Sequence, residues 1–134
     1  MDEKYKVFIE HLEYLGSEIT ENKDEDEIWF SVIHPSSNFT IHFSGIGLFH
    51  RVYLPLKKSL KKEDKITINE FINKSNYEAS ISQIFSNKKV LVLGGFYNGE
   101  YSKLYYGRFL EGFLSDVNEW IVKCQKKIDK LIDW

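Results

Sequence analysis

Residues 27–54 read EIWFSVIHPSSNFTIHFSGIGLFHRVYL, and this stretch decides the fold. It holds three runs rich in aromatic and β-branched residues, at 27–34, 39–44 and 47–54. Such runs, separated by proline, serine, asparagine and glycine, are typical of β-strands joined by tight turns. Apolar and polar residues alternate most clearly over 39–44, FTIHFS, as expected for a strand with one buried face. The stretch therefore predicts a three-stranded antiparallel meander.

Two turn signals predict how these strands pair. Residues 35–38, PSSN, favour a turn that places His42 opposite Ser31. Residues 45–46, Gly-Ile, suit a two-residue type II′ hairpin, because glycine tolerates the positive φ of the first turn position. With that second turn, His42 lies opposite Phe49 on the third strand.

This register separates two faces of the sheet, because side chains alternate along a strand. One face is apolar and is expected to be covered by helices: it carries Ile28, Phe30, Val32, Phe39, Ile41, Phe43, Leu48, Val52 and Leu54. The other face carries Trp29, Ser31, Ile33, Thr40, His42, Phe49, Arg51 and Tyr53. A sheet face left to solvent is mainly polar, whereas this second face has the aromatic residues and arginine that are enriched at protein interfaces.

On the N-terminal side, apolar residues recur every three or four positions from residue 2 to 15, which predicts an amphipathic helix that ends at Gly16. The acidic run 21–27 has no apolar member and lacks the central glycine of a calcium-binding loop, so we expect a solvated connection. The lysine-rich run 57–65 is likewise expected to be a solvated loop.

On the C-terminal side, residues 67–70, TINE, match a capping box and predict a short helix that ends within 73–76. Two more strands are expected at 77–85 and 88–96, joined at 86–87.

The last third of the chain has apolar residues every three to four positions, which predicts one long helix over about 102–132. Two glycines inside it leave an alternative open, since each costs about 1 kcal/mol in a helix interior. In that alternative, Asn98-Gly99 forms a hairpin turn, residues 101–106 form a sixth strand, and Ser115 caps a shorter helix.

The predicted element order is therefore α-β-β-β-α-β-β-α. We expect a single α+β domain over residues 1–134, with two layers and one antiparallel sheet of about five strands.

Residues 69–96, NEFINKSNYEASISQIFSNKKVLVLGGF, carry a family resemblance: a helix that ends in Asn73-Lys74-Ser75-Asn76, then two strands, with a long helix after them. With the element order of nearly the whole chain, this resembles the type III secretion chaperone-like fold, and in particular the YbjN-like family of small bacterial proteins. The resemblance implies a non-enzymatic, often dimeric, protein-binding domain, and it supplies no catalytic residues.

Charge and composition exclude several classes of protein. With 18 Lys and Arg against 20 Asp and Glu, the net charge of −2 provides no basic field for nucleic acid. The single cysteine, Cys124, cannot form an internal disulfide, which indicates a reducing compartment and hence the cytoplasm. No apolar segment is long enough for a membrane span, and the N-terminus does not resemble a signal peptide, so we expect no membrane association.

Metal binding deserves a test because His34, His42 and His50 are spaced eight residues apart. The predicted register places His50 opposite Ile41, so His42 and His50 lie on opposite faces of the sheet. His34 lies about 10 Å from His42 along the sheet, at 3.3 Å per residue. The three therefore do not share an ion, and His11 has no partner at a metal-motif spacing.

Catalytic motifs are also missing from the sequence. No G-x-S-x-G elbow occurs, and Cys124 falls on the apolar stripe of the last helix, where cysteine acts as a small hydrophobe. Gly94-Gly95 is not followed by the residues of a P-loop or a dinucleotide fingerprint. We therefore predict no catalytic, cofactor-binding or metal-binding residues and no cofactor.

The sequence thus predicts a non-enzymatic protein-binding module, chaperone-like or regulatory. Its binding surface is expected to be the second sheet face, centred on Trp29, His42, Phe49, Arg51 and Tyr53, and used for a homodimer or for another protein. One alternative is that a helix or a chain terminus covers this face within the monomer. Two other functions stay open: an immunity or inhibitor protein that blocks a toxin or defence nuclease, and a small enzyme with a convergent, motif-free site.

Overall fold

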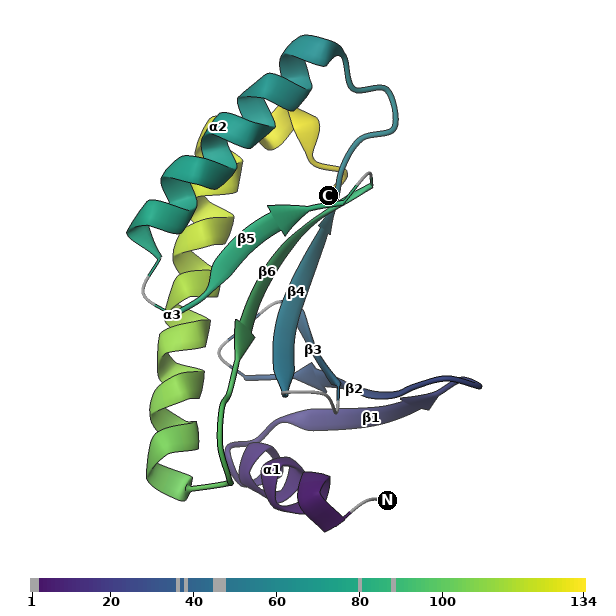
Figure 1. Ribbon diagram of the computed structural model, residues 1–134, viewed down its shortest axis with the longest axis vertical. Helices are drawn as coiled ribbons and strands as arrows, with labels where there is room; N and C mark the ends of the chain where they lie inside the picture. The colour runs from purple at the N-terminus through teal and green to yellow at the C-terminus, as the bar shows by residue number, and fades with distance from the viewer. Residues whose placement is uncertain (1–2, 36, 38, 45–47, 80, 88) are drawn as a thin grey trace.

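One antiparallel sheet organises the molecule (Figure 1), whose computed structural model describes residues 3–35, 37, 39–44, 48–79, 81–87 and 89–134. Its six strands lie in the order β1-β2-β3-β4-β6-β5. They are β1 (Glu18–Lys23), β2 (Ile28–Ile33), β3 (Thr40–Ser44), β4 (Phe49–Pro55), β5 (Gln83–Ser86) and β6 (Val90–Phe96). The helices are α1 (Glu3–Tyr14), α2 (Lys62–Glu78), α3 (Lys103–Lys127) and the 3₁₀ turn η1 (Asp129–Leu131). The predicted α+β class with one antiparallel sheet is confirmed, with one strand more than the five expected.

The first helix ends where the sequence predicts. Gly16 has a φ of +91°, a conformation that glycine adopts without a Cβ clash. Its backbone N–H donates to the Glu13 carbonyl at 2.9 Å, and the N–H of Ser17 donates to the Leu12 carbonyl at 3.0 Å. These two bonds form a Schellman motif, which satisfies the last carbonyls of the helix and turns the chain toward the sheet.

The additional strand, β1, occupies part of the acidic run that we expected to be a solvated connection. It pairs antiparallel with β2 at the edge of the sheet, and none of its six residues is fully buried. The rest of the run forms the turn: the Asp24 carboxylate accepts hydrogen bonds from the backbone N–H groups of Asp26 and Glu27 at 2.9 and 2.7 Å. Edge strands in contact with water need little apolar sequence, which is why alternation did not reveal this one.

The pairing of the meander is predicted correctly on one side and wrongly on the other. His42 lies opposite Ser31, as expected. However, His42 lies opposite Arg51 and not Phe49, and His50 lies opposite Phe43 and not Ile41. Residues 45–46, where we predicted a tight hairpin, lie outside the described residues.

The observed register between β3 and β4 differs from the predicted register by two residues, and this difference leaves the two faces of the sheet unchanged. Ser44 pairs with Phe49, whereas the predicted turn would pair it with residue 47, so the register moves by two residues. Because side chains alternate with a period of two, a shift of two leaves every side chain on its predicted face.

The second helix is longer than predicted at both ends. It begins after Lys61, whose backbone N–H donates to the Asp64 carboxylate at 2.9 Å, so the capping box predicted at 67–70 is wrong. Thr67 instead lies inside the helix and donates to the Glu63 carbonyl at 3.1 Å. The run 57–65 therefore is only partly a loop, because its lysine and acidic residues have good helix propensity.

The C-terminal end of α2 organises the next hairpin. The helix continues to Glu78, beyond the predicted end at 73–76, and β5 is correspondingly shorter than the predicted strand 77–85. The side chain of Asn76 donates to the Ile84 carbonyl at 2.8 Å and accepts from the Ile84 N–H at 2.5 Å. One amide group thus ties the helix to the backbone of β5.

The long C-terminal helix is confirmed, and the alternative with a strand over residues 101–106 is wrong. Ser102 is its N-cap, and its hydroxyl accepts from the backbone N–H of Tyr105 at 3.3 Å. Gly112 has a packing role, because a Cβ there would lie 2.9 Å from Cδ1 of Ile81. The glycine lets the chain before β5 approach the helix closely.

The core lies between the sheet and the helices α1 and α3. The predicted apolar face supplies Phe30, Val32, Ile41, Phe43, Leu48, Val52 and Leu54, all buried. The prediction for Ile28 is wrong, since that side chain is 38% exposed near the turn between β1 and β2. No helix in the described part of the chain combines the length and the apolar character that a bilayer crossing requires.

Candidate functional site

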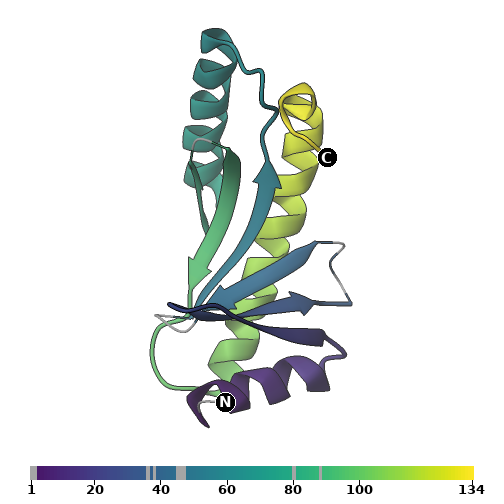
Figure 2. The same ribbon diagram turned by 90° about the vertical axis from the view of Figure 1, so that its right-hand side faces the viewer.

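The sheet face that points away from α3 is the candidate binding surface, and we call it the outer sheet face. Figure 2 shows β4 and β6 in front with α3 behind them, and no helix of the described chain lies in front of these strands. The pairing of the strands places on this face Glu18, Thr20, Asn22, Trp29, Ser31, Ile33, Thr40, His42, Ser44, Phe49, Arg51, Tyr53, Pro55, Gln83, Phe85, Val90, Val92, Gly94 and Phe96. The aromatic members of this set make it unlike an ordinary solvated sheet face.

All five residues predicted for the binding surface lie on the outer sheet face. Trp29, His42, Phe49 and Arg51 are half-buried, and Tyr53 is exposed. They come from β2, β3 and β4, three neighbouring strands, so the predicted set is brought together in space.

Three phenylalanines form a stacked cluster on this face. The ring of Phe49 stacks on Phe96 with centroids 4.5 Å apart and on Phe85 at 6.3 Å. Phe85 and Phe96 are 46% and 58% exposed, which is high for aromatic side chains on a sheet. Below the cluster, Val92 is 2% exposed, so the aromatic rings cover part of the face themselves.

A glycine makes this stacking possible. A Cβ at Gly94 would lie 2.2 Å from Cε1 of Phe49, so the Phe49 ring occupies the space that a side chain would need. Gly94 pairs with Arg51 of β4 and with Gln83 of β5, in the row next to the one that holds Phe49 and Phe96. Sequence reasoning missed Phe85 and Phe96, and this glycine beside an aromatic row is the signal that could have found them.

Arg51 lies at the centre of the outer sheet face between two aromatic rings. Its guanidinium carbon is 5.5 Å from the Phe49 centroid and 5.7 Å from the Tyr53 centroid, within range of a cation–π interaction. The guanidinium donates to the Ser44 hydroxyl at 3.1 Å, to the Phe49 carbonyl at 3.2 Å, and to the Tyr53 hydroxyl. All of these partners are neutral, and within the described residues no carboxylate forms an ion pair with Arg51.

His42 borders this arginine and contributes a neutral imidazole. Its Nδ1 lies 3.3 Å from the Ser31 hydroxyl, and its ring centroid lies 5.4 Å from that of Tyr53. Burial lowers the pKa of His42, and the nearby charge of Arg51 lowers it further. At neutral pH, Arg51 is therefore the fixed cation at the centre of the face, and Glu18 of the edge strand β1 contributes a carboxylate at its border.

The other histidines and the cysteine lie away from this surface. His50 points to the opposite face from His42, as the sequence predicts, and burial lowers its pKa to about 4. Cys124 is fully buried in α3, and burial raises the pKa of its thiol to about 12. Among the residues that the structure describes, no three His, Cys, Asp or Glu side chains are grouped so that they could hold a metal ion. The outer sheet face is therefore an aromatic surface with one cation, Arg51, at its centre.

The architecture is that of an α+β protein in which one antiparallel sheet keeps α1 and α3 on a single face. No model of a protein family matches the chain, and no curated protein matches its sequence. Among solved structures it is similar to the crystal structure of YbjN from E. coli, a candidate transcription regulator, with a TM-score of 0.60 and 10% sequence identity. The match covers 95% of this chain and 93% of that one. The fold is thus YbjN-like, and the predicted resemblance is confirmed at the level of the fold.

Proposed function

We propose that the protein is a non-enzymatic binding module that holds a partner protein against its outer sheet face. The observation that carries this proposal is the stacked cluster of Phe49, Phe85 and Phe96 on a face without a helical cover. Aromatic side chains in such a position lose contact with water when a partner binds, and each is worth about 1.5–3 kcal/mol when fully buried. Aromatic residues and arginine also dominate the energetics of measured interfaces.

Arg51 favours a partner that presents a carboxylate to the outer sheet face. Its guanidinium has only neutral partners within the described chain, so a carboxylate from another protein would add a charge-assisted hydrogen bond. A symmetric homodimer centred on this residue would instead bring two guanidinium groups together near the two-fold axis. We therefore expect a different protein, with an acidic side chain set among apolar ones.

Several observations support binding over catalysis and a location in the cytoplasm. The three groups whose pKa values are shifted most, His50, Tyr106 and Cys124, are all buried and neutral at pH 7. The similar protein YbjN is described as a candidate transcription regulator, and regulators act by binding. A lone buried cysteine suits a reducing compartment.

The test uses two exposed residues of the cluster and a matched control. Phe85→Ser combined with Phe96→Ser removes both outer rings, whereas Tyr77→Ser removes a ring that is 92% exposed on α2. Each variant serves as bait in affinity purification from the source cells, with capture quantified by mass spectrometry and folding checked by thermal melting. We expect the partner to bind the wild type and Tyr77→Ser, to be lost from the double variant, and to bind Arg51→Gln more weakly.

Two results would contradict the proposal in different ways. Equal capture by the folded double variant and by Tyr77→Ser would show that the outer sheet face is not the binding surface. A wild-type dimer in light scattering that the double variant abolishes would make the occupant a second copy of the chain, and the expectation of an acidic partner would be wrong.

A further inference from the structure

A groove between α2 and α3 shares no residue with the outer sheet face. It encloses about 310 Å³, at the lower end of the range of small-molecule sites, about 300–1,000 Å³. The residues that matter to its chemistry are Phe71, Lys74 and Glu78 of α2, Lys123 and Lys127 of α3, and Ile128 just after it.

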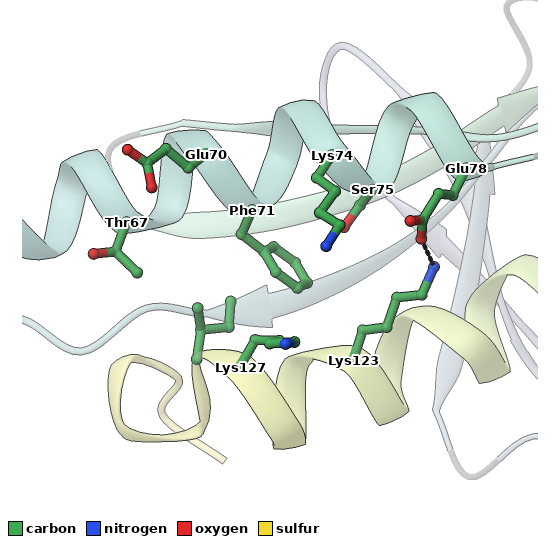
Figure 3. A pocket seen from close by; sticks show the side chains of 9 residues that line it. Thr67, Glu70, Phe71, Lys74, Ser75, Glu78, Lys123 and Lys127 are labelled. Carbon is green, nitrogen blue, oxygen red and sulfur yellow. Dashed lines mark hydrogen bonds and ion pairs between the residues drawn. The ribbon is translucent and has the colours of Figure 1, made fainter.

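Positive charge converges in this groove. Figure 3 shows Lys74 reaching from α2 toward α3 and the ammonium group of Lys127 between the two helices, whereas the carboxylate of Glu70 points away from α3. Lys123 is already paired, because its Nζ lies 2.5 Å from a carboxylate oxygen of Glu78. Within the residues that the structure describes, Lys74 and Lys127 form no ion pair, so the groove has an excess of positive charge.

The groove also has an apolar surface next to these charges. Figure 3 shows the ring of Phe71 pointing into the space between the helices. Ile128 is 2% exposed and lines the same space. A ligand that fits both features has a compact apolar body and one negatively charged group.

A smaller cavity adjoins the groove, and a tryptophan whose indole N–H is unpartnered within the described chain is among its lining residues. It encloses about 20 Å³, shares Ser75, Glu78 and Lys123 with the groove, and is also lined by Trp120. Trp120 is 2% exposed, and its indole Nε1 has no hydrogen-bond partner among the described residues. This volume suits one water-sized atom, and a buried donor without a partner is costly.

We propose that this groove binds a small organic anion. Its charged group lies between Lys74 and Lys127, and its apolar body lies on Phe71 and Ile128. This site shares no residue with the outer sheet face. A negative result for anion binding would therefore leave the proposal of a partner protein on that face unaffected, and the reverse also holds. The indole N–H of Trp120 is a convenient reporter, because Trp120 lines the cavity that adjoins the groove.

The test is a titration of the full chain with naphthoate, followed in two-dimensional amide correlation spectra. We expect shifts confined to residues 67–78 and 120–128, including the Trp120 indole signal. Naphthamide, which has the same rings without the charge, is expected to bind about tenfold more weakly, as is naphthoate to the variant Lys74→Met with Lys127→Met. The matched control is Lys126→Met, an exposed lysine of α3 outside the groove.

The same spectra report whether each variant is folded. Shifts centred on Phe49, Phe85 and Phe96 would mean that the anion binds the outer sheet face and not the groove. Three other results would each overturn the proposal. The first is equal affinity of the wild type for naphthoate and naphthamide, and the second is an equal loss of naphthoate affinity in Lys126→Met and in the double variant. The third is the absence of any saturable shift.

Discussion

Acidification is expected to destabilise the protein through His50. The ring is 1% exposed, with Nδ1 at 2.7 Å from the Leu48 carbonyl and Nε2 at 2.6 Å from the Tyr106 hydroxyl. Because a carbonyl only accepts, Nδ1 carries the proton and Nε2 accepts from Tyr106. Both ring nitrogens of neutral His50 therefore have hydrogen-bond partners. Protonation would turn Nε2 into a donor that faces the donating hydroxyl of Tyr106, and it would place a positive charge in the core.

The pKa values give the sign and size of the effect. An unfolded chain leaves His50 at its ordinary pKa of 6.5, whereas burial, together with the charge of Arg51 and against the Leu48 hydrogen bond, lowers the folded pKa to about 4. Between these values the unfolded state binds more protons, so stability is complete above about pH 6.5 and falls as the pH drops toward 4. The difference between the two pKa values corresponds to about 3.4 kcal/mol of folding stability. About 2 kcal/mol of this stability is lost between about pH 7.5 and pH 5.

Urea unfolding followed by tryptophan fluorescence measures this loss. The variant His50→Gln keeps a donor and an acceptor without titrating, so its stability should fall by about 2 kcal/mol less over the same pH interval. His42→Gln is the control, because His42 is only half-buried. If the folded His50→Gln variant lost as much stability as the wild type, or if NMR titration of the wild type gave His50 a pKa near 6.5, the reasoning would be refuted.

Three further predictions concern single residues. Gly94→Ala should displace the Phe49 ring and cost about 1–3 kcal/mol in urea unfolding, because its Cβ would lie 2.2 Å from that ring; an unchanged Phe49 environment in NMR spectra would contradict this. Gly107→Ala should raise stability by about 1 kcal/mol, because the nearest atom to a Cβ there is 3.9 Å away and the position is inside α3; a loss of stability would mean that α3 is strained there. Cys124 should react with a thiol reagent only in urea, since the thiol is buried with a pKa of about 12; rapid reaction of the native protein would show that α3 opens locally.

The sequence predicted the faces of the sheet better than the pairing of its strands. A period of two assigns Trp29, His42 and Arg51 to one side whatever the neighbouring strand is. Pairing between β3 and β4 depends on the connection, and Ser44 pairs with Phe49, whereas a two-residue turn at 45–46 would pair it with residue 47. The predicted binding surface survived this error because the register shift was even.

Errors elsewhere arose where local patterns compete with tertiary contacts. β1 has no apolar alternation, and its partner β2 supplies the pairing that stabilises it. Phe85 and Phe96 join the outer sheet face only because β6 lies between β4 and β5, and such long-range pairing leaves no local signature. Knowledge of that strand order, combined with Gly94, would have extended the predicted surface to the whole aromatic cluster.

The amide of Asn76 has a consequence for how the protein behaves at high concentration. The two backbone groups of Ile84 that it engages are those that an incoming strand would use to extend the sheet at β5. With that hydrogen-bonding capacity occupied, β5 is a poor template for edge-to-edge polymerisation, and the opposite edge is the charged strand β1, with Glu18, Glu21 and Lys23. An Asn76→Leu variant would expose the backbone of β5, and its fibril formation, followed by thioflavin fluorescence, should rise above that of the wild type.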